Sequence, residues 1–169
     1  MTDVMNDLDK ESGSSLLSSV MLAGILDQID FLKGYPLTKL SGVKRWKVVA
    51  LDVFGDFFVR SGGKIYFIRT ETGKIEETWS SYDDWLKAVI DNPDEVVGLE
   101  FLLAWEEENG RLPDGHRLTP KVPFILGGTY DFDNIVACPL AHIMQLRTAL
   151  ATQLVDVPDG GRVKIEWVG

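Results

Sequence analysis

The chain has 169 residues, of which 45% are hydrophobic and 25% are charged, and its formal net charge is −9. This length and composition are typical of one soluble domain with a complete core. An acidic chain is a poor direct partner for nucleic acid or an anionic membrane, because phosphate binding depends on clustered Lys and Arg. The single cysteine excludes an internal disulfide, and an acidic N-terminus is unlike a secretory signal. We therefore predict a cytoplasmic protein.

The first 45 residues contain one predicted helix. Residues 1–13 are polar, and we expect them to be disordered. Residues 14–45 are expected to form an N-terminal helix and a linker, with Ser14 or Ser15 as the cap and Gly34 and Pro36 as the stop near Leu32. One face of this helix would carry Leu17, Val20, Met21, Gly24, Ile25, Gln28 and Ile29.

Residues 46–169 are predicted to form the main domain, which begins with an antiparallel meander. Its strands are expected at 46–60, 64–70 and 74–79, joined by the glycine-containing turns SGG and TETG. A helix follows at Ser81, with Asp84 three residues later and an apolar face made by Tyr82, Trp85, Leu86, Val89 and Ile90.

A second helix is expected to run from the Asn92 cap and Pro93 to the stop at Gly110, with the interior VVGLEFLLAW mostly in the core. Residues 111–121 are interpreted as a loop. Extended segments at 122–128 and 129–138, a helix from Pro139 to about Leu154, and a last strand at 162–168 complete the chain. This order predicts an α+β fold, with a mostly antiparallel sheet covered by helices on one face.

The pair Gly127 and Gly128 directly precedes the polar stretch TYDFDN. A phosphate loop is disfavoured, because an extended segment and not a helix follows the glycines. Asp131, Asp133 and Asn134 provide too few oxygens at the spacing of a calcium loop. We therefore interpret the motif as a tight turn between two strands, and we predict neither a metal nor a cofactor.

Two rival functions rest on residues close to this turn. Cys138 at the start of a helix, with His142 four residues later, could serve a thiol enzyme, although a lone cysteine beside Val and Ala is more often a small buried hydrophobic residue. His116 has no fixed sequence relation to this pair. A second rival is a small-molecule or regulatory module with a pocket near Tyr130 and His142. The favoured prediction is a protein that is not an enzyme.

The negative charge is concentrated in one segment. Residues 71–110 contain twelve acidic residues and two lysines, so they carry −10, while the rest of the chain sums to +1. Three consecutive carboxylates stand at the C-terminal end of a predicted helix, where the helix dipole disfavours negative charge. A solvated face is the simple interpretation. The alternative is a surface that steers a basic protein, with the candidate residues Asp83, Asp84, Asp94, Glu95, Glu106, Glu107 and Glu108.

From about Ala50 onward, the chain resembles the C-terminal domain of bacterial type VI secretion immunity proteins, which often follows a GAD-like domain. The resemblance rests on DVFGDFFVR, KIYFIRTETGKIEE, the acidic helical region and VPFILGGTYDFDNIVACPLAHIMQL. Gly127, Gly128, Asn134 and His142 occupy the places of the family's Gly-Gly turn, Asn and helical His. The SUKH-type immunity superfamily is the second resemblance. The region before Trp46 is shorter than a complete GAD-like domain.

The resemblance implies an immunity protein that binds and neutralises a cognate toxin, often a nuclease. It implies no catalytic residues. Together with the acidic segment, it predicts a basic toxin, such as a DNase, as the partner, and no direct contact with nucleic acid or membrane.

Overall fold

A computed structural model of the chain describes residues 2–13, 16–22, 34–158, 161 and 164. Four strands form an antiparallel meander in the order β1 (Lys47–Leu51), β2 (Phe57–Ser61), β3 (Lys64–Arg69) and β4 (Lys74–Trp79). A separate two-stranded antiparallel sheet contains β5 (His116–Pro120) and β6 (Ile135–Pro139). The predicted α+β class and the meander are confirmed, and the later strands pair with each other.

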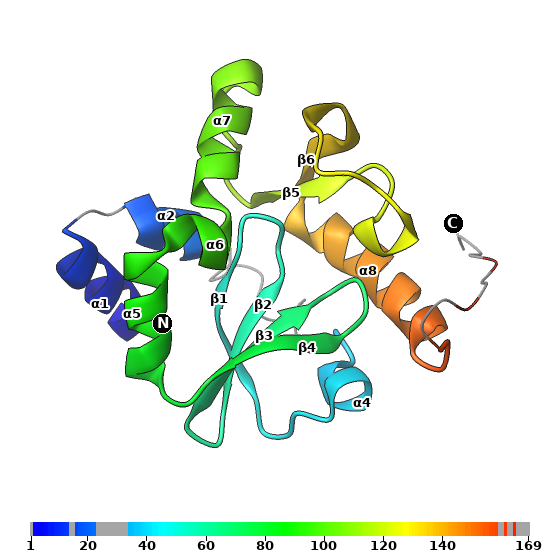
Figure 1. The fold of residues 1–169 in the computed structure, drawn as a ribbon, viewed down its shortest axis with the longest axis horizontal. Coiled ribbons are helices and arrows are strands. Elements are labelled where there is room, and N and C mark those ends of the chain that lie inside the picture. Colours follow the sequence, from blue (N-terminus) through cyan, green and yellow to red (C-terminus); the bar gives the residue numbers. More distant parts are fainter. Residues whose placement is uncertain (1, 14–15, 23–33, 159–160, 162–163, 165–169) are drawn as a thin grey trace.

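Helices surround the meander. They are α1 (Thr2–Ser12), α2 (Leu16–Leu22), α4 (Leu37–Ser41), α5 (Tyr82–Asp91), α6 (Pro93–Val97), α7 (Leu99–Asn109) and α8 (Leu140–Leu154). Figure 1 shows α1, α2, α5 and α6 together on the left of the meander and α8 on its right. Among the described residues, no helix has the length and apolar character needed to span a membrane.

The core forms on both sides of β2, where Phe57, Phe58 and Val59 are all buried. Successive strand residues point to opposite faces. Phe57 meets Tyr35 edge to face, with ring centroids 5.2 Å apart, while Phe58 lies 5.6 Å from Trp85 of α5. Aromatic side chains therefore pack on both faces of β2.

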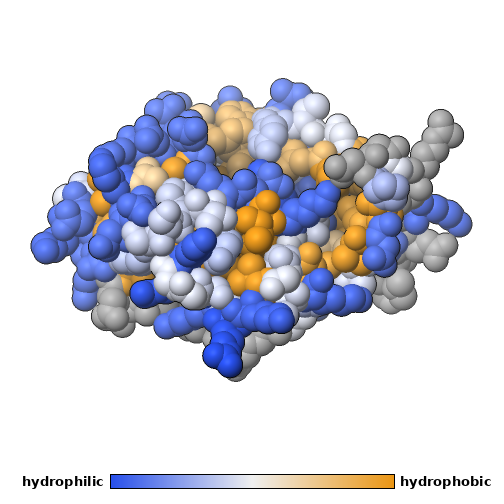
Figure 2. Space-filling model, turned by 60° about the horizontal axis from the view of Figure 1, so that its bottom comes forward, coloured by the Kyte–Doolittle hydropathy of each residue, from blue (hydrophilic) through white to orange (hydrophobic). Residues whose placement is uncertain are grey.

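Hydrophobic side chains that reach the surface are dispersed on the face seen in Figure 2, where hydrophilic residues lie between the apolar groups. Among the large hydrophobic residues with substantial exposure are Ile75 of β4, Leu103 of α7 and Leu146 of α8. Their separation on three different elements is normal for a soluble domain.

The segment 46–60, expected as one strand, is two strands joined by a tight turn at Asp52–Asp56. The turn closes when Asp52 N donates to Asp56 O at 3.1 Å and Gly55 N donates to Asp52 O at 3.2 Å, with Gly55 at a φ of +84°. Its residues Val53 and Phe54 are buried, with 1% and 6% exposure. An apolar turn of this kind has the same residue pattern as a continuous buried strand, which explains the error.

The N-terminal residues expected to be disordered instead include α1. Val4 and Leu8 are buried, and the Asp7 carboxylate accepts a hydrogen bond from the Tyr82 hydroxyl of α5 at 3.1 Å. This helix is ordered by tertiary packing, which its polar composition does not reveal. In α2, Leu17 and Met21 are buried as expected. The predicted continuation from 23 to 32 lies outside the described residues, and the expected linker contains α4.

Ser81 caps α5 as predicted, because its side chain accepts a hydrogen bond from Asp84 N. The next predicted helix is divided in two. Gly98 adopts a left-handed conformation with φ +75° between α6 and α7, and the Asn92 side chain makes no capping bond. The interior is also less buried than expected, since Leu103 and Ala104 of α7 are exposed.

Three expectations in the second half of the chain were wrong. The loop predicted at 111–121 contains β5, the extended segment predicted at 122–128 contains a 3-10 turn, and the strand predicted at 129–138 begins only at Ile135. The residues before it form two 3-10 turns, Phe124–Leu126 and Phe132–Asn134. The helix after Pro139 is confirmed as α8, ending at Leu154. The last predicted strand, 162–168, falls almost entirely outside the described residues.

Gly98→Ala should destabilise the protein more than Gly42→Ala. Both glycines are in the left-handed conformation with a φ of +75°, so both variants incur a backbone penalty of about 1–2 kcal/mol. A Cβ on Gly98 would also lie 2.8 Å from a methyl carbon of Val53, whereas one on Gly42 meets nothing within 4 Å. We expect an additional loss of about 1–3 kcal/mol for Gly98→Ala. Urea denaturation measures both losses, and equal losses would contradict the close contact.

Candidate functional site

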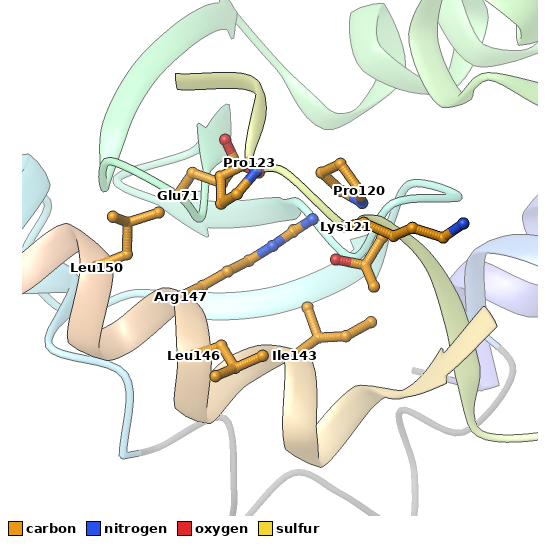
Figure 3. A pocket seen from close by; sticks show the side chains of 9 residues that line it. Glu71, Pro120, Lys121, Pro123, Ile143, Leu146, Arg147 and Leu150 are labelled. Carbon is orange, nitrogen blue, oxygen red and sulfur yellow. The ribbon is translucent and has the colours of Figure 1, made fainter. Parts of the chain in front are cut away.

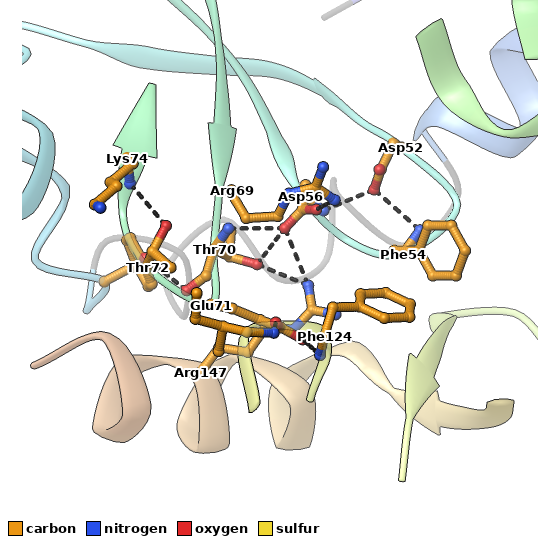
Figure 4. Close-up of polar contacts among 12 residues, drawn as sticks. Asp52, Phe54, Asp56, Arg69, Thr70, Glu71, Thr72, Lys74, Phe124 and Arg147 are labelled. Atoms are coloured by element: carbon orange, nitrogen blue, oxygen red, sulfur yellow. Dashed lines mark hydrogen bonds and ion pairs between the residues drawn. The ribbon is translucent and has the colours of Figure 1, made fainter. Parts of the chain in front are cut away.

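A buried ion-pair network joins the start of β2, the end of β3 and α8 (Figure 4). At its centre is Asp56, which is 1% exposed. Its Oδ1 accepts hydrogen bonds from Thr70 N at 2.7 Å, Thr70 Oγ1 at 2.7 Å and Arg147 Nη1 at 3.2 Å. Its Oδ2 accepts one from Arg69 Nη1 at 3.0 Å. Both carboxylate oxygens are satisfied, so the network has a structural role.

Asp52 is a second buried carboxyl group beside this network. Its Oδ1 accepts the backbone N–H groups of Phe54 at 2.9 Å and Asp56 at 2.7 Å. Burial raises the pKa of the Asp52 carboxyl to about 7, and the nearby charge of Asp56 contributes to the rise. The turn is also anchored through Val53, whose N–H donates to Val97 O and whose carbonyl accepts Leu118 N. It therefore holds α6 and β5 in fixed positions.

The Gly-Gly motif forms part of a braced loop. Asn134 Oδ1 accepts Val122 N at 2.9 Å, and its Nδ2 donates to Thr129 O at 2.8 Å. A Cβ on Gly128 would lie 1.8 Å from Val122 O, so only glycine fits there. Gly127, with φ +91°, ends the first 3-10 turn. The motif is a structural turn as expected, but it lies between 3-10 turns and not between strands.

Glu71 braces the same loop from the β3–β4 turn. It is 2% exposed, and its two oxygens accept the backbone N–H groups of Phe124 at 3.4 Å and Ile125 at 3.0 Å. Buried backbone donors need such partners. Glu71 therefore belongs to the scaffold, although the sequence grouped it with the acidic segment.

The predicted acidic residues lie on three consecutive helices, α5, α6 and α7. Asp83, Asp84, Asp94, Glu95, Glu107 and Glu108 are exposed, and none of them forms an ion pair with another described residue. Asp94 and Glu106 also have structural roles. Asp94 Oδ1 accepts Glu100 N at 3.0 Å, and half-buried Glu106 accepts Leu112 N at 2.7 Å. We call the six exposed carboxylates the acidic face.

A groove of about 260 Å³ joins the acidic face to an aromatic cluster. The exposed acids Asp94 and Glu95 line it, together with Arg69 and Asp52. Its aromatic lining is formed by Phe54, Phe67, Phe101 and Tyr130. Tyr130 is 52% exposed, stacks on Phe124 with ring centroids 4.0 Å apart and lies 5.8 Å from Phe54. The fold thus brings residues from distant segments into one groove, and of these residues the sequence had connected only Tyr130 with a pocket.

The residues of the two rival functions do not come together in this way. Tyr130 lines the groove, but His142 is an exposed residue of α8 and does not line it. Cys138 lies in β6 opposite Arg117, outside the helix that was expected to favour its thiolate. Burial raises the pKa of the Cys138 thiol. His116 is in β5, where Nδ1 lies 3.0 Å from Asp114 O. This arrangement favours an unreactive thiol at neutral pH.

Asp131 and Asp133 are exposed, and the Asn134 side chain is occupied by backbone groups. Within the part of the chain that the structure describes, no three His, Cys, Asp or Glu side chains gather into a possible metal site.

Comparisons with known proteins found no matching family model, no matching curated protein and no matching solved structure.

Asp56→Asn should destabilise the fold strongly. The change leaves two guanidinium groups, one of them on the buried Arg147, without their common carboxylate. Breaking a buried pair typically costs about 3–5 kcal/mol. Chemical denaturation measures the loss, and Asp133→Asn, a change at an exposed acid, is the control. A loss for Asp56→Asn no larger than that of the control would contradict the central role of this network.

Asp52→Asn should change how stability depends on pH. The pKa of Asp52 is about 7 in the folded protein against 3.8 for the free side chain, so the folded state binds more protons between these values. Wild-type stability therefore contains a contribution that is lost as pH rises through this window. Asn retains the acceptor oxygen and does not ionise. Relative to wild type, the variant should gain stability from about pH 4 to pH 7 and then level off. The free energy of unfolding is measured by chemical denaturation at each pH. A difference between variant and wild type that does not change with pH would contradict the raised pKa.

Proposed function

We propose that this chain is a non-enzymatic immunity protein that acts in the cytoplasm by binding and neutralising a basic bacterial toxin. The observation that carries the proposal is the acidic face: six exposed carboxylates on three consecutive helices, without ion-pair partners among the described residues. Unpaired charges of one sign attract and orient a partner of opposite sign. A nuclease, which needs basic residues to hold a phosphate backbone, is the toxin class that best fits this charge.

The groove beside the acidic face supports the proposal further. Protein interfaces combine an apolar, aromatic centre with a polar rim, and Tyr and Arg are enriched in their most important contacts. Tyr130 offers an exposed aromatic ring that Phe54 and Phe124 hold in place, and the exposed acids Asp94 and Glu95 line the same groove. A basic side chain of the toxin could pair with these carboxylates while its stem covers the ring.

The resemblance of residues 50–169 to type VI secretion immunity proteins favours this reading over a general acidic binding module. If the resemblance holds, the toxin is delivered by a type VI secretion system. The chain then protects the producing cell and its siblings. On this proposal, Gly127, Gly128 and Asn134 maintain the loop that presents Tyr130, and His142 makes no contact with the toxin.

The direct test begins with the native partner. Tagged protein is used to capture its partner from lysate of the native host, and the captured protein is then expressed alone and together with this chain. We expect a basic protein that stops growth when expressed alone, and normal growth when both are expressed. A partner that is harmless alone, or whose toxicity persists despite complex formation, would overturn the proposed function.

Neutralising the acidic face should slow association with that partner. The variants Asp83→Asn with Asp84→Asn, and Glu107→Gln with Glu108→Gln, each remove two charges from the acidic face. The control pair, Asp133→Asn with Asp156→Asn, removes two exposed charges elsewhere. At low salt, we expect a severalfold slower association rate for the first two variants and a dissociation rate close to that of wild type.

Added salt gives a second readout of the same mechanism. The differences between variants should shrink as the Debye length falls to about 8 Å at 0.15 M ionic strength and below at higher salt. Surface plasmon resonance or stopped-flow fluorescence measures these rates. Equal rates for the face variants and the control pair, or rates that salt does not change, would remove electrostatic steering from the mechanism.

A further inference from the structure

A second cavity, of about 220 Å³, lies between α8, the end of β5 and the β3–β4 turn (Figure 3). It shares no lining residue with the groove beside the acidic face. Its walls are largely apolar and are formed by Pro120, Pro123, Ile143, Leu146 and Leu150. Ile143 and Leu150 are buried, each with 1% exposure, while Leu146 is 41% exposed and stands at the mouth.

Arg147 extends from α8 into this cavity, and its side chain is only 5% exposed. Its Nη1 donates to Asp56 Oδ1 and to Thr70 Oγ1 at 3.2 and 2.7 Å. Its Nε and Nη2 have no hydrogen-bond partner within the described ranges, and neither is a fully enclosed atom, so this edge reaches the open space of the cavity. A guanidinium can hold a carboxylate through two parallel N–H···O bonds, and the edge with Nε and Nη2 is available for such a pair.

The other polar groups of the lining fit an anion. The Thr119 hydroxyl makes no hydrogen bond with another described residue, so it can donate to a ligand. Lys121 Nζ adds a positive charge and donates to Asp133 O at 2.6 Å. Glu71 is the one acid of the lining, and both of its oxygens accept backbone N–H groups of the loop.

The balance of charge is also favourable. The lining of the cavity contains two cations, Arg147 and Lys121, against one acid, Glu71. Arg147 also shares the Asp56 carboxylate with Arg69, beside the buried Asp52 carboxyl. The lining itself therefore has one more positive than negative group, in a protein with a net charge of −9.

We propose that this cavity binds a small aliphatic carboxylic acid in its ionised form. The carboxylate pairs with the free edge of Arg147 and accepts a hydrogen bond from Thr119. The aliphatic part lies against Ile143 and Leu150, and Leu146 covers the entrance. The cavity is smaller than the roughly 300–1,000 Å³ of drug-sized sites, which limits the ligand to a few carbon atoms. This site is independent of the toxin and of the acidic face.

The test compares two probes of the same shape, 4-methylpentanoate and its uncharged amide, 4-methylpentanamide. Each is titrated into the full chain up to millimolar concentration, and binding is followed by calorimetry and by the melting temperature. We expect the carboxylate to bind roughly tenfold or more tightly than the amide, because only the carboxylate gains a charge-assisted bidentate pair. In ¹H–¹⁵N spectra, the Nε–H signal of Arg147 should shift with the carboxylate.

Three variants, one of them a control, locate the binding without disturbing the buried network. Leu146→Trp fills the mouth of the cavity, and Leu103→Trp places the same ring on α7, where Leu103 is 44% exposed. Thr119→Val removes the hydroxyl group while keeping the shape of the side chain. The carboxylate should bind several times more weakly to Leu146→Trp and to Thr119→Val, and normally to Leu103→Trp.

Three results would overturn the proposal: no binding of the carboxylate, equal binding of both probes, or equal affinity in Leu146→Trp and Leu103→Trp. The first two would mean that water satisfies the free edge of Arg147, and the third would place the carboxylate elsewhere. None of these measurements uses the toxin, so the outcome is separate from that of the proposed function.

Discussion

The rest of the structure depends on keeping one carboxylate, that of Asp56, ionised in the interior. An isolated buried charge is very unfavourable, and it is tolerated here because backbone, hydroxyl and guanidinium donors surround it. These donors come from the end of β3 and from α8, which are far apart in the sequence. Satisfying Asp56 therefore determines where α8 lies against the meander. The loop that Glu71 braces lies beside α8, since Glu71, Pro123 and residues of α8 line the same cavity.

The same constraint separates two kinds of acidic residue in this protein. Asp52, Asp56 and Glu71 are buried and accept backbone N–H groups, so they belong to the scaffold. The six carboxylates of the acidic face are exposed and have no ion-pair partner among the described residues, so they are available to a partner protein. Electrostatic steering depends on solvent-exposed charges on one side of the molecule. The ion-pair network instead depends on carboxylates that are buried away from water. The proposed toxin surface therefore rests on the exposed carboxylates. The proposed carboxylate cavity rests on Arg147, which belongs to the buried network.

Several local features were predictable because the chemistry that causes them is local. Ser81 caps α5 through its own hydroxyl, Pro139 precedes α8, and the glycines at 127 and 128 permit a turn that bulkier residues would block. The concentration of acidic residues in α5–α7 can be read from the sequence, whereas their exposure, and the half-buried position of Glu106, come from the structure. Errors occurred where apolar residues form a turn, as in Val53 and Phe54, and where a polar segment is ordered only by packing, as in α1.

The sequence by itself determined the α+β class, the meander, the concentration of negative charge and most helix starts, because these depend on residue periodicity, turn chemistry and composition over short distances. Only the tertiary structure decided that Asp56 meets Arg147, that Tyr130 meets the α6–α7 bend, and that β5 and β6 form their own sheet. These contacts join residues that are 91 positions apart for Asp56 and Arg147, 29 for Phe101 and Tyr130, and 15 to 23 for the paired residues of β5 and β6. No local pattern records such pairing, which is why the groove beside the acidic face and the carboxylate cavity emerged only from the structure, whereas the acidic residues were already grouped by the sequence.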